Sequence, residues 1–397
     1  MYCIFNLLQN YKEIALQGFG YQDNLRIKNH EFTVHTGFEP DKGLAISEVF
    51  DRGKFIYASN NYYGLRKKNE AGIDEQYLKE VAYGLHRQVI EDIRILFYIH
   101  EKIRALRQAN PHYRLGKIFF ARNFYEEAVD NFTRAIQLDN KLIKAYKLLA
   151  LIYLKQKKYQ DATQLLEKAV SMEPDFPDLL NCLGVIHTHS GRFESARDVL
   201  QKALDIKEDF PEANFNLGVL LFLSTLQENS HDDTVVLPAR VMRTFKHIRE
   251  HEAYQSDEWQ KLFTHTAELM ETGNREAVIE ALATLQLKLV AAEHLNVTMD
   301  TFFLKFMYGG KELKREEVEK FEKIFQEEGE QLNRYADYWN ELGVIHLIQC
   351  RDYFLKALNE FERATKINPK YDAALNSLEL MKHGKKGFLI LLRAILR

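Results

Sequence analysis

The sequence predicts a mainly α-helical protein in which helical hairpins stack into a solenoid, preceded by a small α+β module with an antiparallel sheet. Three observations support this prediction. A pattern of small and apolar residues recurs every 34 residues, alternating apolar residues occupy the first part of the chain, and a long amphipathic stretch lies between them. A fixed period of this length indicates that each unit buries its apolar face against the next.

The repeat runs from residue 109 to residue 222 without a shift in register. Each unit has Leu-Gly or Leu-Ala, then Ala, then Phe or Leu, then Ala. The positions are Leu115, Gly116, Ala128, Phe132 and Ala135 in the first unit; Leu149, Ala150, Ala162, Leu166 and Ala169 in the second; Leu183, Gly184, Ala196, Leu200 and Ala203 in the third; and Leu217 and Gly218 at the start of a fourth. Small side chains at these positions predict that two helices approach closely there.

This pattern resembles the tetratricopeptide repeat (TPR), a unit of two antiparallel helices called A and B. The resemblance covers 109–225, as three units and helix A of a fourth, and 337–383 near the C-terminus. It implies a TPR-like α-solenoid whose A helices line a concave groove. It also implies a non-catalytic scaffold or adaptor that binds a peptide segment of a partner protein in that groove.

The groove-facing positions follow from the register of the A helices. They are Tyr113, Lys117 and Phe120 in the first unit; Lys144, Lys147, Leu151 and Leu154 in the second; Asn181, Val185 and Thr188 in the third; and Phe215, Val219 and Phe222 in the fourth. Lysines lie toward one end and apolar residues toward the other. We therefore expect a partner segment with acidic and apolar anchors.

Residues 1–74 are expected to form the α+β module. Alternating apolar residues predict strands at Glu31–His35, Leu44–Phe50 and Lys54–Ala58. The sequence Asp51-Arg52-Gly53 predicts a tight turn between the last two strands. Together these signals indicate a small antiparallel sheet of three or four strands.

Residues 75–108 carry apolar residues at steps of three and four, which predict one long helix. In one interpretation the apolar stripe packs on the sheet and the first repeat. In the other it forms a dimerising coiled coil, which would make the chain a self-assembling structural subunit and a homodimer. The first is favoured because the apolar spacing is not a strict heptad.

Residues 226–336 interrupt the array. Helices are predicted at 237–253, 257–271, 275–294, 298–308 and 314–334. The segment 257–290 has the features of one degenerate repeat. The insertion therefore either continues the solenoid or forms a separate helical subdomain.

The segment 337–383 predicts a C-terminal repeat unit and one following helix. It has Trp339, Leu342, Gly343, Ala357, Phe361 and Ala364 in the order seen in the regular units. The gap from Gly343 to Ala357 is two residues longer than in those units, which places the predicted turn around Cys350 to Tyr353. Residues 384–397 are expected to form a terminal capping or partner-binding helix. Contact of 388–397 with a membrane surface is a weaker alternative, because this segment carries basic residues.

The residues His247, Glu250 and His251 match the H-x-x-E-H pattern of inverted zinc proteases. On a helix the two histidines would lie one turn apart and could share a Zn²⁺ ion, with the glutamate as base. A zinc-dependent hydrolase or metal-binding protein is therefore the alternative function. Charged residues flank the string and favour a solvated helix face, so we expect no catalytic residue, no metal and no cofactor.

The bulk properties exclude several classes of protein. A formal net charge of −3 without a basic block argues against nucleic-acid binding. Cys3, Cys182 and Cys350 are too far apart in the sequence to indicate a disulfide framework. The N-terminus lacks a basic region before its short apolar run, and no stretch is apolar enough to span a bilayer, so we expect a cytoplasmic protein.

Overall fold

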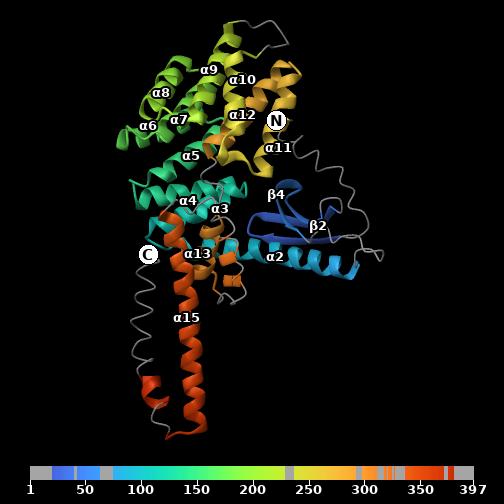
Figure 1. Cartoon of the computed structure of the whole chain (residues 1–397), viewed down its shortest axis with the longest axis vertical. Coiled ribbons are helices and arrows are strands. Elements are labelled where there is room, and N and C mark those ends of the chain that lie inside the picture. Colours follow the sequence, from blue (N-terminus) through green and yellow to red (C-terminus); the bar gives the residue numbers. More distant parts are fainter. Residues whose placement is uncertain are drawn as a thin grey trace. The chain divides into compact units, whose positions relative to one another are not determined.

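The computed structural model of the chain is shown in Figure 1. It describes residues 20–39, 43–62, 75–228, 237–291, 297–310, 317–319, 321–323, 326, 336–370 and 374–379. The chain divides into two compact units, Met1–Val297 and Thr298–Arg397, which are treated separately below.

The first unit begins with a four-stranded antiparallel sheet in which neighbouring strands are consecutive in sequence. Its strands are β1 (Tyr21–Ile27), β2 (His30–Glu39), β3 (Leu44–Asp51) and β4 (Lys54–Tyr62). The three predicted strands are present, each longer than predicted. The predicted tight turn is also present, because Arg52 and Gly53 both have positive φ, as a two-residue hairpin turn of type I′ requires. The sequence analysis missed β1, a strand whose side chains are exposed or only partly buried.

One face of the sheet is covered by helix α2 (Glu75–Ile103). The covered face carries the cross-strand pairs Val34–Val49 and Thr36–Ser47, and all four side chains are buried. Along α2 the apolar stripe is buried as well, including Leu85, Val89, Ile93 and Leu96. The stripe therefore packs within the chain, as the first interpretation predicts.

The repeat array follows as seven helices in the predicted A and B order. They are α3 (Ala109–Ala121), α4 (Tyr125–Leu138), α5 (Ile143–Lys155), α6 (Tyr159–Met172), α7 (Pro177–His189), α8 (Phe193–Ile206) and α9 (Pro211–Glu228). Strong packing within each hairpin and between adjacent hairpins gives the stacked arrangement in Figure 1.

The small residues of the repeat lie where two helices cross. A Cβ atom placed on Gly116 would lie 2.7 Å from the ring of Phe132, and one on Gly184 would lie 2.5 Å from Cγ of Leu200. The B-helix alanines of all three units, such as Ala128 and Ala196, are fully buried. The prediction of close helix approach at these positions is confirmed.

The insertion adds four elements to the first unit: α10 (Ala239–Glu250), the short 3₁₀ turn η2 (Glu252–Tyr254), α11 (Asp257–Glu271) and α12 (Arg275–Ala291). Helix α10 packs on α9 in the place of a fourth helix B, with its Val241 and Thr244 facing Gly218. Helices α11 and α12 form a hairpin. The helices predicted over this part of the insertion are confirmed, with α10 a few residues shorter than expected.

The second unit contains α13 (Thr298–Tyr308) and α15 (Ala336–Ile367). Most of the helix predicted over 314–334 and all of 384–397 lie outside the described residues. The predicted C-terminal hairpin is wrong, because α15 runs without a break through Cys350 and Tyr353. Consistently, a Cβ on Gly343 would meet no atom of the described residues within 4 Å, so none of the described helices crosses closely at this position.

Candidate interaction groove

The A helices α5, α7 and α9 form the inner face of the array, where the groove was predicted. Of the predicted groove residues, Lys144 is exposed and Lys117 is partly buried. The others are buried: Tyr113, Phe120, Lys147, Leu151, Leu154, Asn181, Val185, Thr188, Phe215, Val219 and Phe222. Much of the inner face is therefore covered within the chain itself.

Helix α12 covers part of this face, because it packs against α5, α7 and α9. Near its start, the Arg275 guanidinium donates a hydrogen bond of 2.8 Å to the carbonyl oxygen of Leu226 on α9. Further along, Gln286 lies beside His189 at the end of α7. Near its end, the charge of Lys288 acts on Lys155 at the end of α5. The helix thus crosses the C-terminal ends of three successive A helices.

An apolar cluster fixes α12 to the fourth unit and to the rest of the insertion. The cluster contains Phe215, Val219 and Phe222 of α9; Val241, Phe245 and Ile248 of α10; Tyr254; Leu262, Phe263 and Met270 of α11; and Val278, Leu282, Leu285 and Leu289 of α12. The three groove residues predicted in the fourth unit are therefore members of a core. Sequence periodicity showed that they would point inward and left open whether the insertion would cover them.

Polar side chains interrupt this apolar contact where α12 crosses α7. Asn216 donates a hydrogen bond of 2.8 Å to the side chain of Asn181, and both residues are buried. Gln286 is fully buried, and no well-formed hydrogen bond reaches either of its amide atoms from the described residues. Burial lowers the pKa of His189, and the adjacent Gln286 amide partly offsets that effect. The Gln286 amide therefore lies next to His189 without forming a hydrogen bond of normal geometry.

Basic side chains gather where α12 crosses α5. The Lys155 side chain is exposed, but the crowding around its ammonium lowers its pKa to about 8, first through desolvation and then through the charges of Lys288 and Lys54. The Lys155 ammonium donates a hydrogen bond to the Tyr125 hydroxyl and lies 4.7 Å from the centre of that ring. The sequence analysis did not find this cluster, because its members come from a strand, a repeat helix and the insertion.

A partly buried polar network joins the sheet to the first repeat. His30 of β2 contacts Asp51 Oδ2 through Nδ1 at 2.8 Å and Glu127 Oε1 of α4 through Nε2 at 2.9 Å. The hydrogen bond to Glu127 raises the pKa of His30, burial opposes this rise, and the bond to Asp51 adds to it. Burial by itself would raise the pKa of Glu127, but its hydrogen bond with His30 and its other contacts bring it below the usual value. This network holds the repeat array against the N-terminal module.

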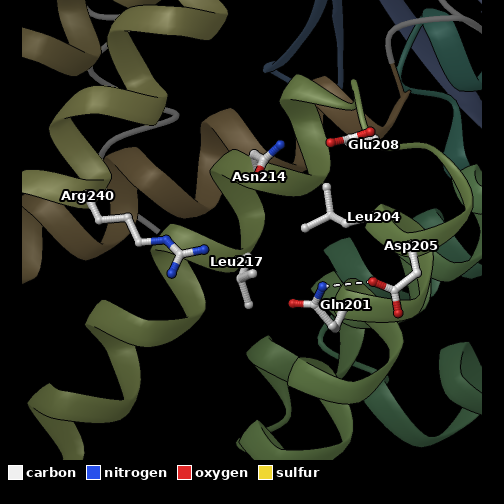
Figure 2. Close-up of a pocket in the computed structure, with 7 residues that line it drawn as sticks. All are labelled: Gln201, Leu204, Asp205, Glu208, Asn214, Leu217 and Arg240. Carbon is white, nitrogen blue, oxygen red and sulfur yellow. Dashed lines mark hydrogen bonds between the residues drawn. The ribbon is translucent and has the colours of Figure 1, made fainter.

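A shallow cavity of about 420 Å³ opens between α8, α9 and α10 (Figure 2). Its lining residues are Gln201, Leu204, Asp205, Glu208, Asn214, Leu217 and Arg240. Figure 2 shows the Gln201 amide donating to Asp205, at 3.0 Å, while Arg240 reaches in from the opposite side. The lining contains no histidine, cysteine or serine that could act as a nucleophile or as a base near neutral pH.

The H-x-x-E-H string lies at the C-terminal end of α10. The helix ends at Glu250, and His251 is its C-cap (φ −67°, ψ 138°), after which the chain leaves the helical path. His251 instead accepts a hydrogen bond from the backbone N–H of Ala253 at 3.3 Å, and Glu250 pairs with Lys246. Among the described residues, no group of three or more His, Cys, Asp or Glu side chains could hold a metal ion.

Comparisons with known proteins agree with the repeat pattern. Residues 153–214 match the family described as tetratricopeptide repeat, and residues 116–157 match the family described as TPR repeat. No curated protein matches the sequence. Within the described part of the chain, no helix is both long and apolar enough to cross a membrane.

Three solved structures are similar to parts of this chain. MamA is 17% identical, covering 39% of this chain and 90% of its own, with a TM-score of 0.33. YrrB, described as a TPR protein with an unusual peptide-binding site, is 20% identical, covering 53% and 98%, with a TM-score of 0.30. A mutant of the Thermobaculum terrenum O-GlcNAc transferase is 23% identical, covering 34% of this chain and 23% of its own, with a TM-score of 0.25. These similarities concern the fold alone.

Proposed function

Since residues 116–214 consist of tetratricopeptide repeats, which act in general as protein-interaction modules, we propose that this chain is a non-catalytic adaptor. It binds a segment of a partner protein along the inner face of the array. The observation that supports this proposal is that the inner face accepts a helix, α12, across three successive A helices. The exposed Lys144 and the partly buried Lys117 extend this face toward the first unit and supply positive charge.

The partner segment is expected to combine acidic and apolar side chains. Acidic residues would contact Lys144 and Lys117, and apolar residues would pack on the part of the inner face next to these lysines. In helix-in-groove binding, the groove contacts apolar residues that lie at helical spacing along one side of the partner helix. Charged residues at the edge of the groove orient that helix.

Site-specific photo-crosslinking tests this proposal in native cells. A photo-reactive amino acid replaces Lys144 on the inner face or, as a control, the exposed Gln164 on helix α6. We expect a discrete crosslinked protein from position 144 and none from position 164. A second substitution, Lys117→Glu, should reduce the yield at position 144 severalfold without changing the melting temperature. Equal crosslinking at the two positions, or no effect of Lys117→Glu, would contradict the assignment of the groove.

The choice of variants follows from burial. Lys144 is exposed, so its replacement leaves the core unchanged. Phe215, although predicted to face the groove, is fully buried in the apolar cluster. Its truncation to alanine is expected to cost about 3–5 kcal/mol of stability, and a loss of binding in that variant would not identify a binding surface.

A further inference from the structure

We propose that the fourth repeat unit carries a second docking site, which binds an acidic segment of a partner protein that contains one lysine. The site consists of the solvent-exposed side of α10 and the adjacent cavity between α8, α9 and α10. It uses none of the groove residues, so the proposal is independent of the function proposed above. It would let the chain hold two partner segments at separate surfaces.

The charge of α10 is unlike that of the helices it resembles in position. The regular B helices α4, α6 and α8 each contain more carboxylates than Lys and Arg residues. Helix α10, which takes the place of a fourth helix B, contains four basic residues and a single carboxylate, Glu250. The basic residues are Arg240, Arg243, Lys246 and Arg249. The apolar side of α10 is buried in the core, so the excess positive charge lies toward solvent.

The arginines at the start of α10 have no neutralising partner. Arg240 and Arg243 are exposed, and neither forms an ion pair with a carboxylate of the described residues. On α8, in contrast, both basic side chains are paired: Arg197 with Glu194 at 3.3 Å, and Lys202 with Asp175 at 3.5 Å. Carboxylates brought by a partner would therefore supply the charge that the chain itself does not place next to α10.

The spacing of the basic residues sets the size of the partner segment. Arg240, Arg243 and His247 follow each other at steps of three and four residues, so they lie along one side of the helix. At 1.5 Å per residue they span about 10 Å. Met242, which is 46% exposed, adds an apolar contact on the same helix. A short segment with a few carboxylates is long enough to cover this surface.

The cavity beside α10 accounts for the lysine. Its lining includes the aliphatic side chains of Leu204 and Leu217 and the carboxylates of Asp205 and Glu208, and Arg240 lies on the opposite side (Figure 2). Glu208 is exposed and forms no hydrogen bond or ion pair with the rest of the described chain. A lysine could lay its aliphatic stem on the leucines and bring its ammonium to these carboxylates. The same carboxylates would repel a nucleic-acid or lipid phosphate, which favours a protein segment of mixed charge.

The test uses the purified full chain and two labelled synthetic peptides at low ionic strength. The first peptide has one lysine followed by four glutamates, and in the second a glutamate replaces the lysine. Fluorescence anisotropy should show saturable binding of the first peptide and at least about threefold weaker binding of the second, because its added carboxylate meets those of the cavity. A site that recognised negative charge alone would bind the second peptide more tightly.

Variants of the chain assign the two parts of the site. Arg240→Glu combined with Arg243→Glu should weaken binding of the first peptide at least about tenfold. Glu208→Gln should weaken binding of the first peptide about threefold and should not weaken binding of the second. All three side chains are exposed, so the melting temperature should remain unchanged.

Two control variants separate this site from the overall charge and from the groove. Arg197→Glu combined with Lys202→Glu on α8 changes the net charge by the same amount, and Lys144→Glu changes the inner face. Both should leave the affinity for the first peptide within about twofold. An equal loss in either control, no saturable binding to wild type, or an unchanged affinity in the Glu208→Gln variant would each overturn the inference.

Competition identifies the class of partner. Single-stranded RNA and vesicles that contain phosphatidylserine are added to the complex with the first peptide. Displacement by either, at a lower concentration of negative charge than the unlabelled peptide requires, would overturn the assignment to a protein segment. Because Lys144 takes no part in this site, failure here leaves the crosslinking experiment on the groove unaffected, and the two failures are distinguishable.

Discussion

The packing of the repeat array depends on single residues that have almost no side chain. At Gly116 the ring of Phe132 occupies the space that a Cβ would need, and at Gly184 the side chain of Leu200 does the same. Both glycines were singled out by their position in the sequence repeat. Their role follows from sterics, because two helices can approach this closely only where one of them presents a hydrogen atom.

Replacing Gly184 by alanine should therefore destabilise the chain. The added Cβ would lie 2.5 Å from Cγ of Leu200, and the resulting overpacking is expected to cost about 1–3 kcal/mol. The matched control is Gly84→Ala in α2, where a Cβ would meet no atom within 4 Å. That substitution should stabilise the chain by about 0.5–1 kcal/mol, since alanine is the better helix former. Urea unfolding of both variants measures the difference, and equal effects would refute the role of Gly184.

The junction between the sheet and the repeats depends on the protonation of His30. This histidine titrates at 6.5 in the unfolded chain and has a raised pKa in the folded chain, where Glu127 and Asp51 favour its charged form. Its contribution to stability is therefore complete below pH 6.5. It is lost as the pH rises through the folded pKa.

His30→Gln should remove this pH dependence. At pH 6 the variant is expected to be less stable by about 1–3 kcal/mol, because two partly buried carboxylates lose their charged partner. The difference from wild type should shrink as the pH rises above 6.5. Burial lowers the pKa values of His112, His187 and His189, and their contribution cancels in the difference between the two chains. A difference in the free energy of unfolding that is constant from pH 5.5 to 9 would contradict the predicted network.

Among the elements, the turns of the three regular hairpins share one geometry. The turn residues Asn123, Lys157 and Gly191 all have positive φ and are 34 residues apart. After each, a backbone N–H donates to a carbonyl five residues earlier, as from Phe124 to Phe119, which is the pattern of a Schellman motif. The backbone conformation of the turn therefore repeats in each unit, even though the residue with positive φ is Asn, Lys or Gly in the three units.

Exchanging residue types at two of these turns should change stability in opposite directions. Lys157 and Gly191 are both exposed, with φ values of 60° and 75°. Gly191→Ala should destabilise the chain by about 1 kcal/mol, since residues with a Cβ are disfavoured at positive φ. Lys157→Gly should stabilise it by a few tenths to about 1 kcal/mol, with the larger entropy of glycine in the unfolded chain reducing the gain. Thermal unfolding distinguishes this from the alternative in which both substitutions shift the midpoint in the same direction.

The H-x-x-E-H string lies at the C-terminal end of α10. Sequence matching assumed a continuous helix through His251, but the helix stops at Glu250. We therefore predict that His247→Ala and His251→Ala leave the metal content of the purified chain unchanged. Metal analysis of both variants and wild type checks this, and one zinc per chain that is lost in either variant would restore the hydrolase alternative.

At the level of the whole molecule, the insertion covers the array that it interrupts. Its apolar periodicity predicted helices at α11 and α12 and left open whether they would continue the solenoid. The structure shows that α12 turns back onto the inner face. Periodicity shows which side of a helix will be buried. The surface against which that side packs depends on residues that are distant in the sequence.

Truncation before and after α12 should separate its contribution from that of the second unit. A fragment ending at residue 297 retains all of the first unit and is expected to unfold cooperatively. A fragment ending at residue 274 lacks α12 and with it four buried aliphatic side chains, each worth about 1.5–3 kcal/mol. It should therefore unfold at a lower urea concentration and bind more of a hydrophobic dye. Equal unfolding midpoints for the two fragments would show that α12 is not part of this core.

The repeat units, their crossings and three of the four strands follow from the sequence, because each depends on residues close together in the chain or at a constant separation. The regular spacing of Gly116, Ala128, Gly184 and Ala196 was enough to place two helices against each other. Only the tertiary structure decided that α15 is a single helix and that α12 covers α5, α7 and α9. The physical reason is that burial of an apolar surface is not directional, so the pattern of a helix identifies the face that leaves water and says nothing of the surface that it meets.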